Sequence, residues 1–140
     1  AALKFLAEMR IPIFRTVIYG ESLGTGVAVE MARNKAISAL ILEAPFSSMM
    51  AAASRHFKFF PVRFLVRDKY DSISKINEIK APVLILHGVR DKTVPFDLGR
   101  KLYEAAPTPK KFYDFPEAGH NNLYDFGAAE RVIQFLESNS

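Results

Sequence analysis

A serine between two glycines, at Gly20, Ser22 and Gly24, is the strongest structural signal in this sequence. The apolar residues 16–19 precede it and the helix-like residues 27–32 follow it, which predicts a strand, a sharp turn and a helix, with a hydroxyl group on the turn. The backbone of such a turn is strained, and side chains two residues to either side would collide, so both glycines are expected to have a steric role. We interpret the segment as a nucleophile elbow with Ser22 at its apex.

Strand and helix patterns alternate after this turn. The short, continuous apolar runs at residues 39–42 and 83–86 fit strands that are buried on both faces of a parallel sheet, and the alternating residues 111–115 fit an outer strand. Helical patterns cover residues 24–34, 97–106 and 122–137, and Asp97 and Asn122 are the expected N-caps of the last two. This order predicts an α/β fold, with a parallel sheet and helices on both of its faces.

Residues 46–80 interrupt the alternation, and aromatic and basic side chains interleave in them. One interpretation is a set of short helices whose phenylalanines cover the sheet while Lys and Arg reach into water. The other is a lid that lines an acyl pocket and contacts a membrane surface or anionic head groups.

Charge and composition exclude several classes of function. The net charge is only +4 and the basic residues are scattered, so binding to nucleic acid is not expected. The chain has no cysteine, which excludes disulfides and thiolate metal sites. No apolar run approaches the roughly 20 residues of a membrane span, and residues 1–10 lack the layout of a signal peptide. A cytoplasmic or membrane-peripheral location is favoured, and the oligomeric state stays open.

A serine nucleophile needs a histidine that takes its proton and a carboxylate that holds this histidine in the right tautomer. His120 follows the last predicted strand, at the sheet edge where the sites of parallel sheets form, and is the candidate base. A position on a surface loop, without chemistry, is its alternative. His87 is expected to close its strand, and His56, in the insert, to pack or to face water.

Asp91 is the candidate acid because it lies just beyond the predicted strand at residues 83–86, on the same sheet edge as Ser22 and His120. The chain order Ser22, Asp91, His120 is the one that accompanies a nucleophile elbow. The alternative is an aspartate that only shapes its loop through an Asx turn. Glu43 ends the preceding strand and is the second candidate, since a carboxylate there could also reach the imidazole.

Four segments together resemble the carboxyl-terminal part of an α/β-hydrolase, in the lipase-like branch that includes monoacylglycerol-lipase-like and protein-depalmitoylase-like members. They are residues 20–26, 44–48, 87–95 and 119–121. The resemblance implies that Ser22 is the nucleophile, Asp91 the acid and His120 the base, and that the Leu23 backbone N–H is one donor of the oxyanion hole. It also implies hydrolysis of a small-molecule carboxylic ester or thioester through an acyl-enzyme, with no metal or organic cofactor.

The same resemblance implies that residues 1–140 form a partial domain, which holds strands five to eight of an eight-stranded sheet. The loop with the second oxyanion donor would lie outside this chain, and the strand at residues 16–19 would be unpaired on one side. We therefore expect the chain to be part of a larger protein, and to be weak or inactive alone.

Three other functions are weighed against this one. Gly20, Gly24 and Gly26 also resemble the phosphate loop of short-chain dehydrogenases, but no Tyr-x-x-x-Lys occurs, and Val29 stands where the dinucleotide fingerprint needs a third glycine. A serine peptidase of the same fold stays open, because the same three residues can cleave either bond. A catalytically incomplete binding module also stays open.

Overall fold

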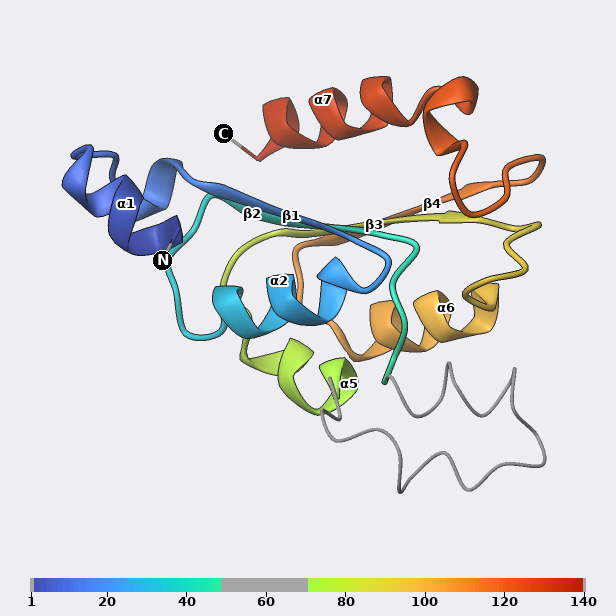
Figure 1. The fold of residues 1–140 in the computed structure, drawn as a ribbon, viewed down its shortest axis with the longest axis horizontal. Helices are drawn as coiled ribbons and strands as arrows, with labels where there is room; N and C mark the ends of the chain where they lie inside the picture. The colour runs from blue at the N-terminus through green and yellow to red at the C-terminus, as the bar shows by residue number, and fades with distance from the viewer. Residues whose placement is uncertain (1, 49–70, 140) are drawn as a thin grey trace.

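The computed structural model describes residues 2–48 and 71–139. In these ranges a four-stranded parallel sheet lies between helices on both faces (Figure 1), as the sequence predicted. The strands are β1 (Val17–Glu21), β2 (Ala39–Glu43), β3 (Val83–Gly88) and β4 (Lys110–Phe115), side by side in chain order. The α-helices are α1 (Ala2–Glu8), α2 (Gly24–Ala32), α5 (Ser72–Lys75), α6 (Phe96–Ala105) and α7 (Ala128–Ser138), and the 3₁₀ helices are η1 (Ile13–Arg15), η2 (Ile76–Glu78) and η3 (Leu123–Phe126).

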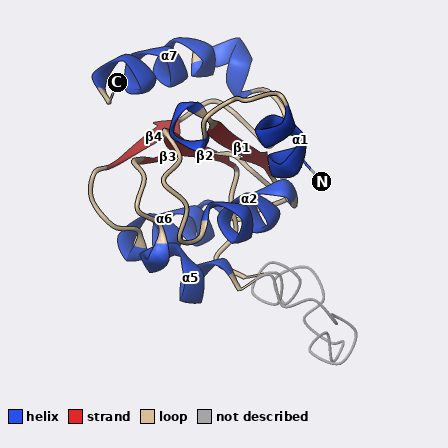
Figure 2. Ribbon diagram, turned by 90° about the vertical axis from the view of Figure 1, so that its left-hand side faces the viewer, coloured by secondary structure: helices blue, strands red, loops and turns tan. Residues whose placement is uncertain are grey.

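The core has two apolar layers, one on each face of the sheet. Helices α2, α5 and α6 cover one face and α7 covers the other (Figure 2). Strands β2 and β3 are buried at every position, because alternate side chains of each strand enter opposite layers. Burial of each Leu or Ile side chain contributes roughly 1.5–3 kcal/mol to stability. This is why both strands are read from the sequence as unbroken apolar runs.

The register of the sheet brings the carboxyl ends of the strands to one edge. Glu21 pairs with Glu43, Glu43 with Leu86, and Gly88 with Phe115. The loops that follow β1, β3 and β4 therefore leave the sheet at the same edge. These loops carry the three candidate residues.

The helix predicted over residues 122–137 is wrong in its first part. Residues 123–126 form η3, and α7 begins only at Ala128, because Gly127 adopts a left-handed conformation with φ of 88°. Asn122 precedes η3 instead of α7, and its side-chain oxygen accepts a hydrogen bond from the Gly119 N–H at 2.8 Å instead of capping the helix. The cap predicted at Asp97 is also wrong, since Pro95 holds the N-cap position of α6 and Asp97 lies in its first turn.

The insert predicted at residues 46–80 is only partly described. Its last part contains α5 and η2, and Ile76 and Ile79 belong to the core layer beside α2 and α6. A salt bridge of 2.7 Å between Lys75 and Glu30 joins α5 to α2. This end of the insert is thus part of the folded core. The predicted lid and its membrane contact depend on residues 49–70, and they lie outside the described residues.

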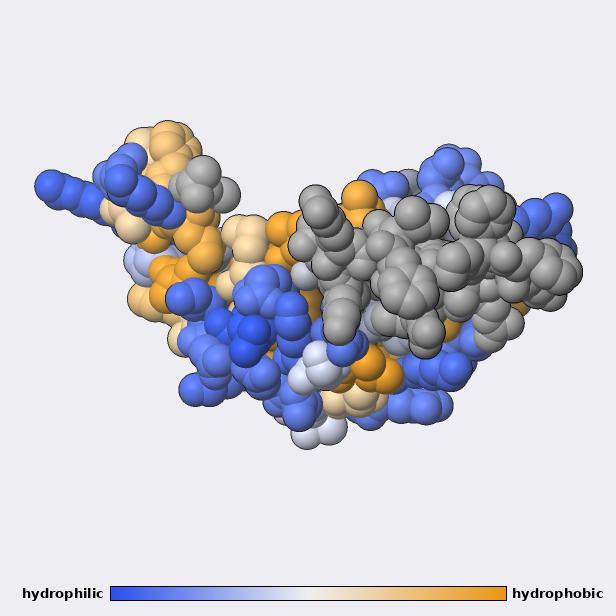
Figure 3. Space-filling view, turned by 60° about the horizontal axis from the view of Figure 1, so that its bottom comes forward, coloured by the Kyte–Doolittle hydropathy of each residue, from blue (hydrophilic) through white to orange (hydrophobic). Residues whose placement is uncertain are grey.

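Strand β1 is an edge strand, as the resemblance implied, and β2 is its only neighbour within the described ranges. Apolar surface gathers at the end of the molecule that carries α1 (Figure 3). The exposed apolar side chains there are Phe5, Met9, Ile11, Ile13, Phe14, Val17 and Val27. A groove of about 420 Å³ runs between α1, β1 and α2. No helix within residues 2–48 and 71–139 has the length and apolar character that a membrane crossing needs.

Candidate active site

Ser22 lies on the turn between β1 and α2, in the strained backbone that the sequence predicted. Its φ is 48°, in the left-handed region that non-glycine residues seldom adopt. Its N–H donates to the Glu43 carbonyl at 2.9 Å, and its carbonyl accepts from the Thr25 N–H at 3.0 Å and the Thr25 hydroxyl at 2.6 Å. These bonds tie both sides of the serine to the neighbouring strand and the following helix.

The two glycines of the elbow have different roles. A Cβ on Gly20 would lie 2.7 Å from the Ala28 Cβ and 2.7 Å from the Gly24 carbonyl oxygen, so only glycine fits there without a shift. A Cβ on Gly24 would have no described atom within 4 Å. The steric role predicted for Gly24 is therefore wrong for the part of the chain that the structure describes.

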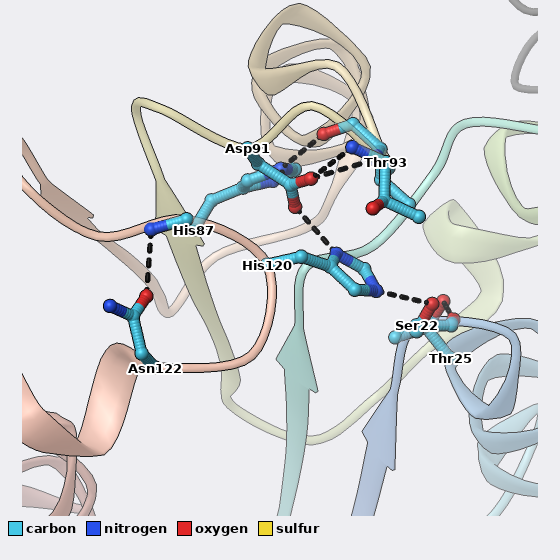
Figure 4. Close-up of polar contacts among 9 residues, drawn as sticks. Ser22, Thr25, His87, Asp91, Thr93, His120 and Asn122 are labelled. Atoms are coloured by element: carbon cyan, nitrogen blue, oxygen red, sulfur yellow. Dashed lines mark hydrogen bonds and ion pairs between the residues drawn. The ribbon is translucent and has the colours of Figure 1, made fainter.

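His120 joins Ser22 to Asp91 across the sheet edge (Figure 4). Its Nε2 lies 2.9 Å from the Ser22 Oγ, and its Nδ1 lies 2.7 Å from the Asp91 Oδ2. An ionised carboxylate can only accept, so Nδ1 carries the proton and the neutral imidazole leaves Nε2 free to accept from the serine hydroxyl. The structure thus brings together the three candidates that the sequence placed on one edge.

The two carboxylate oxygens of Asp91 have separate partners. Oδ1 accepts the backbone N–H groups of Thr93 and Val94, each at 2.8 Å, while Oδ2 faces His120. The loop-shaping role and the imidazole-orienting role were posed as alternatives, and the residue makes both sets of contacts. Burial opposes ionisation of Asp91, but the hydrogen bonds it accepts from two imidazoles and two backbone N–H groups outweigh burial. They lower the pKa of Asp91 to about 2.

Close packing sets the distance between the Asp91 loop and the His120 loop. A Cβ on Gly88, at the end of β3, would lie 2.3 Å from the Gly119 carbonyl oxygen. The N–H of Arg90 donates to the Ala118 carbonyl at 3.0 Å. The backbone of one loop therefore rests directly on the backbone of the other, which fixes the imidazole beside the carboxylate.

Glu43, the second candidate acid, makes no hydrogen bond to His120. It is buried at the end of β2 and accepts a short hydrogen bond from the Tyr19 hydroxyl, which also contacts the Tyr124 hydroxyl at 2.9 Å. Burial raises the pKa of Glu43, although the Tyr19 hydrogen bond and the charge of His120 act in the opposite direction. Burial and these hydrogen bonds raise the pKa of Tyr19 well above its usual range. Glu43 is close enough to influence the imidazole electrostatically.

The remaining positions that the sequence singled out are Leu23, His87 and His56. Leu23 lies at the N-terminus of α2, directly after the serine, where backbone N–H groups have no acceptor inside the helix. His87 lies near the end of β3, one residue before Gly88, and it also contacts Asp91, which the sequence did not predict. The sequence signal that could have indicated this contact is the spacing of four residues between His87 and Asp91. His56 lies outside the described residues. In the described ranges no group of acidic, histidine or cysteine side chains could hold a metal ion.

Two relatives of similar sequence are named alpha/beta hydrolase domain-containing proteins. The chain is 35% identical over 121 residues to alpha/beta hydrolase domain-containing protein 17B of Homo sapiens, covering 86% of this chain and 41% of that protein. It is 33% identical over 134 residues to alpha/beta hydrolase domain-containing protein aho-3 of Caenorhabditis elegans, covering 94% and 39%. An uncharacterized protein of Mycobacterium tuberculosis is 40% identical over 108 residues, covering 77% and 38%. The chain thus spans about two fifths of these relatives. No protein-family model matches it.

Solved structures share the fold. An acetyl xylan esterase from Paenibacillus sp. R4 has a TM-score of 0.80 at 20% identity, over 99% of this chain and 50% of that one. The Pyrococcus furiosus esterase Pf2001 has a TM-score of 0.76 at 22% identity, over 99% and 59%. At such identities the likeness describes the arrangement of the sheet and helices and leaves the reaction open.

Proposed function

We propose that this chain, which belongs to the α/β-hydrolase superfamily, carries the catalytic residues of a serine hydrolase that cleaves carboxylic ester or thioester bonds. The observation that carries the proposal is the continuous line of hydrogen bonds from Ser22 through His120 to Asp91, at 2.9 and 2.7 Å. Because the chain spans only part of its relatives, the activity is proposed for the complete protein.

In the first half of the reaction, the Ser22 Oγ attacks the carbonyl carbon of the substrate while its proton passes to the His120 Nε2. The tetrahedral intermediate carries a negative charge on oxygen, for which the Leu23 N–H is one donor. As the intermediate collapses, the bond to the leaving alcohol or thiol breaks and His120 returns the proton to that group. The acyl chain stays on Ser22 as an ester.

In the second half, water attacks this ester and the same steps release a carboxylic acid and the free serine. His120 takes a proton from the water and then gives it to the Ser22 oxygen. Asp91 keeps the Nδ1–H tautomer and stabilises the imidazolium that forms in each half. The low pKa of Asp91 supports this role, because a carboxylate that stays ionised at neutral pH always accepts from Nδ1.

Covalent labelling tests the proposal. We expect a fluorophosphonate to label Ser22 in the complete protein, labelling to disappear in Ser22→Ala and to fall strongly in His120→Ala. Ser138→Ala is the matched control, since the Ser138 hydroxyl donates to the Gln134 carbonyl on the exposed surface of α7. Labelling that persists in Ser22→Ala would refute the assignment of the nucleophile. A wild-type protein that is never labelled would favour a binding module.

The bond that is cleaved needs a separate assay. We expect turnover of p-nitrophenyl esters or of acyl thioesters, and a series from acetate to palmitate measures the preferred chain length. The names of the solved esterases favour starting with esters. Cleavage of peptides without cleavage of either ester class would make the protein a peptidase and refute this part of the proposal.

A further inference from the structure

His87 is a fully buried imidazole that the mechanism does not use. It lies in β3 one residue before the end of the strand, with an exposed fraction of 0%, and its ring meets the edge of Phe96 at 5.5 Å between ring centroids. A Cβ on Gly99 would lie 2.2 Å from the His87 Nδ1, so α6 can approach the ring only because residue 99 is glycine. The ring is therefore held in one place by the strand and by α6.

The two nitrogens of this ring have different surroundings. Nε2 lies 3.0 Å from the Val94 carbonyl oxygen and 3.4 Å from the Asp91 Oδ2. Both oxygens can only accept, so Nε2 carries a proton. Nδ1 is buried and has no hydrogen-bond partner among the described residues, so nothing there stabilises a second proton. The geometry fits a neutral imidazole of the Nε2–H tautomer.

This N–H reaches the loop that carries the candidate acid. The loop is closed by the two backbone N–H groups, of Thr93 and Val94, that donate to the Asp91 Oδ1. His87 adds a contact to the Val94 carbonyl and one to the Oδ2 of the same aspartate. Oδ2 is also the oxygen that accepts from the His120 Nδ1.

We propose that His87 is a positioning residue for the reaction: its Nε2–H holds the Asp91 carboxylate so that Oδ2 faces His120, and it shares the charge of that oxygen. This inference rests on the proposed function. The polar contacts of His87 are with Val94 and Asp91. Its effect on the reaction passes through Asp91.

Two measurable consequences follow from the loss of this N–H. The carboxylate loses a contact that holds its orientation, and a displaced catalytic group lowers kcat/KM by about tenfold to a hundredfold. His120 is then the remaining imidazole that interacts with the charge on Oδ2, and this favours the imidazolium form of His120. The acid limb of the kcat/KM profile moves to higher pH by about half a unit, because the base must be neutral to act. Among the described residues, Asp91 and Glu43 are charged groups that act on His120, and both are present in wild type and variant.

His87→Met and His87→Gln in the complete protein separate these effects from a loss of packing. Methionine fills the cavity without a donor, whereas the glutamine amide can place an N–H where Nε2 stood. Ile85→Met is the control, because Ile85 is fully buried two residues earlier on the same strand and belongs to an apolar cluster. We expect His87→Met to lower kcat/KM and to shift the acid limb, and His87→Gln to restore both.

A rate loss in His87→Met without a pH shift, or a profile that matches Ile85→Met, would overturn the proposal. If His87→Met does not fold, ¹⁵N NMR of the wild-type imidazoles decides: a protonated Nε2 with a bare Nδ1 supports it, and a protonated Nδ1 refutes it. Fluorophosphonate labelling of the wild type is the separate control for the reaction. Its absence would refute the proposed function, while the NMR measurement would still report on His87.

Discussion

Replacing Asp91 by asparagine removes one charge and leaves the shape of the residue almost unchanged. The amide oxygen can still accept the two backbone N–H groups that Oδ1 accepts at 2.8 Å, so the loop is expected to keep its conformation. The amide nitrogen then takes the place of Oδ2 and points its N–H groups at His120. The Nδ1 that faces this amide must then be the unprotonated nitrogen, so the proton of the neutral imidazole lies on Nε2. It can no longer accept from Ser22, and we expect kcat to fall about ten-thousand-fold.

The same substitution changes how stability depends on pH. The pKa of Asp91 is about 2 in the folded chain, well below its ordinary value of 3.8. At about 1.36 kcal/mol per unit, the ionised carboxylate stabilises the folded state by about 2 kcal/mol at neutral pH. A lowered pKa means that this stabilisation is present above pH 3.8 and is lost as the pH falls toward 2. Asparagine has no such proton to gain.

Urea unfolding of both proteins, followed by circular dichroism from pH 6 downward, measures this contribution. We expect the difference in unfolding free energy between wild type and Asp91→Asn to be constant above pH 5. It should shrink by about 1 kcal/mol by pH 3 and by about 2 kcal/mol by pH 2. A difference that stays flat over this range would show that the folded state does not hold Asp91 ionised, and the reasoning from its hydrogen bonds would fail.

Two further predictions concern the elbow and the second acid. Gly20→Ala should lower the free energy of unfolding by about 1–3 kcal/mol, because its Cβ would meet the Ala28 Cβ at 2.7 Å. Gly24→Ala should change this free energy by less than about 0.5 kcal/mol, because its Cβ meets no described atom. Urea unfolding midpoints compare the two variants, and equal losses of stability would contradict the packing described. Glu43→Gln keeps an oxygen for the Tyr19 hydroxyl and should lower kcat/KM by less than about tenfold. A loss as large as that of Asp91→Asn would make Glu43 the acid.

The sequence predicted the sheet well because its central strands are unusual in composition. Strands β2 and β3 are buried on both faces, so their apolar runs contain no polar residue and fit few other kinds of secondary structure. The end of the chain was predicted less well, although Gly127 was visible inside the helical pattern. A single glycine is tolerated in many helices, and its φ of 88° in the structure shows that it breaks this one. The cap predicted at Asp97 was wrong because Pro95, two residues earlier, already sets the start of α6.

The sequence predicted the candidate site to the extent that the order of residues and the ends of the strands determine it. Parallel strands bring their carboxyl ends to one edge, and this is why residues as distant as Ser22 and His120 could be paired from sequence. The sequence could not show how Asp91 divides its two oxygens between the loop and the imidazole. It also could not show that His87 shares one of them, because that contact depends on how closely α6 approaches β3 at Gly99. Such distances come from packing between elements, which no local pattern records.

The position of Ser22 depends on contacts that are separate from those that orient His120. Its left-handed backbone costs on the order of 1–3 kcal/mol. Three hydrogen bonds, one to Glu43 and two from Thr25, oppose this cost with about 0.5–1.5 kcal/mol each. None of the three involves Asp91 or the His120 imidazole, so the serine keeps its place whichever carboxylate orients His120. Labelling of Ser22 in Asp91→Asn and Glu43→Gln can therefore identify which carboxylate serves the proposed reaction, since neither substitution removes the contacts that hold Ser22.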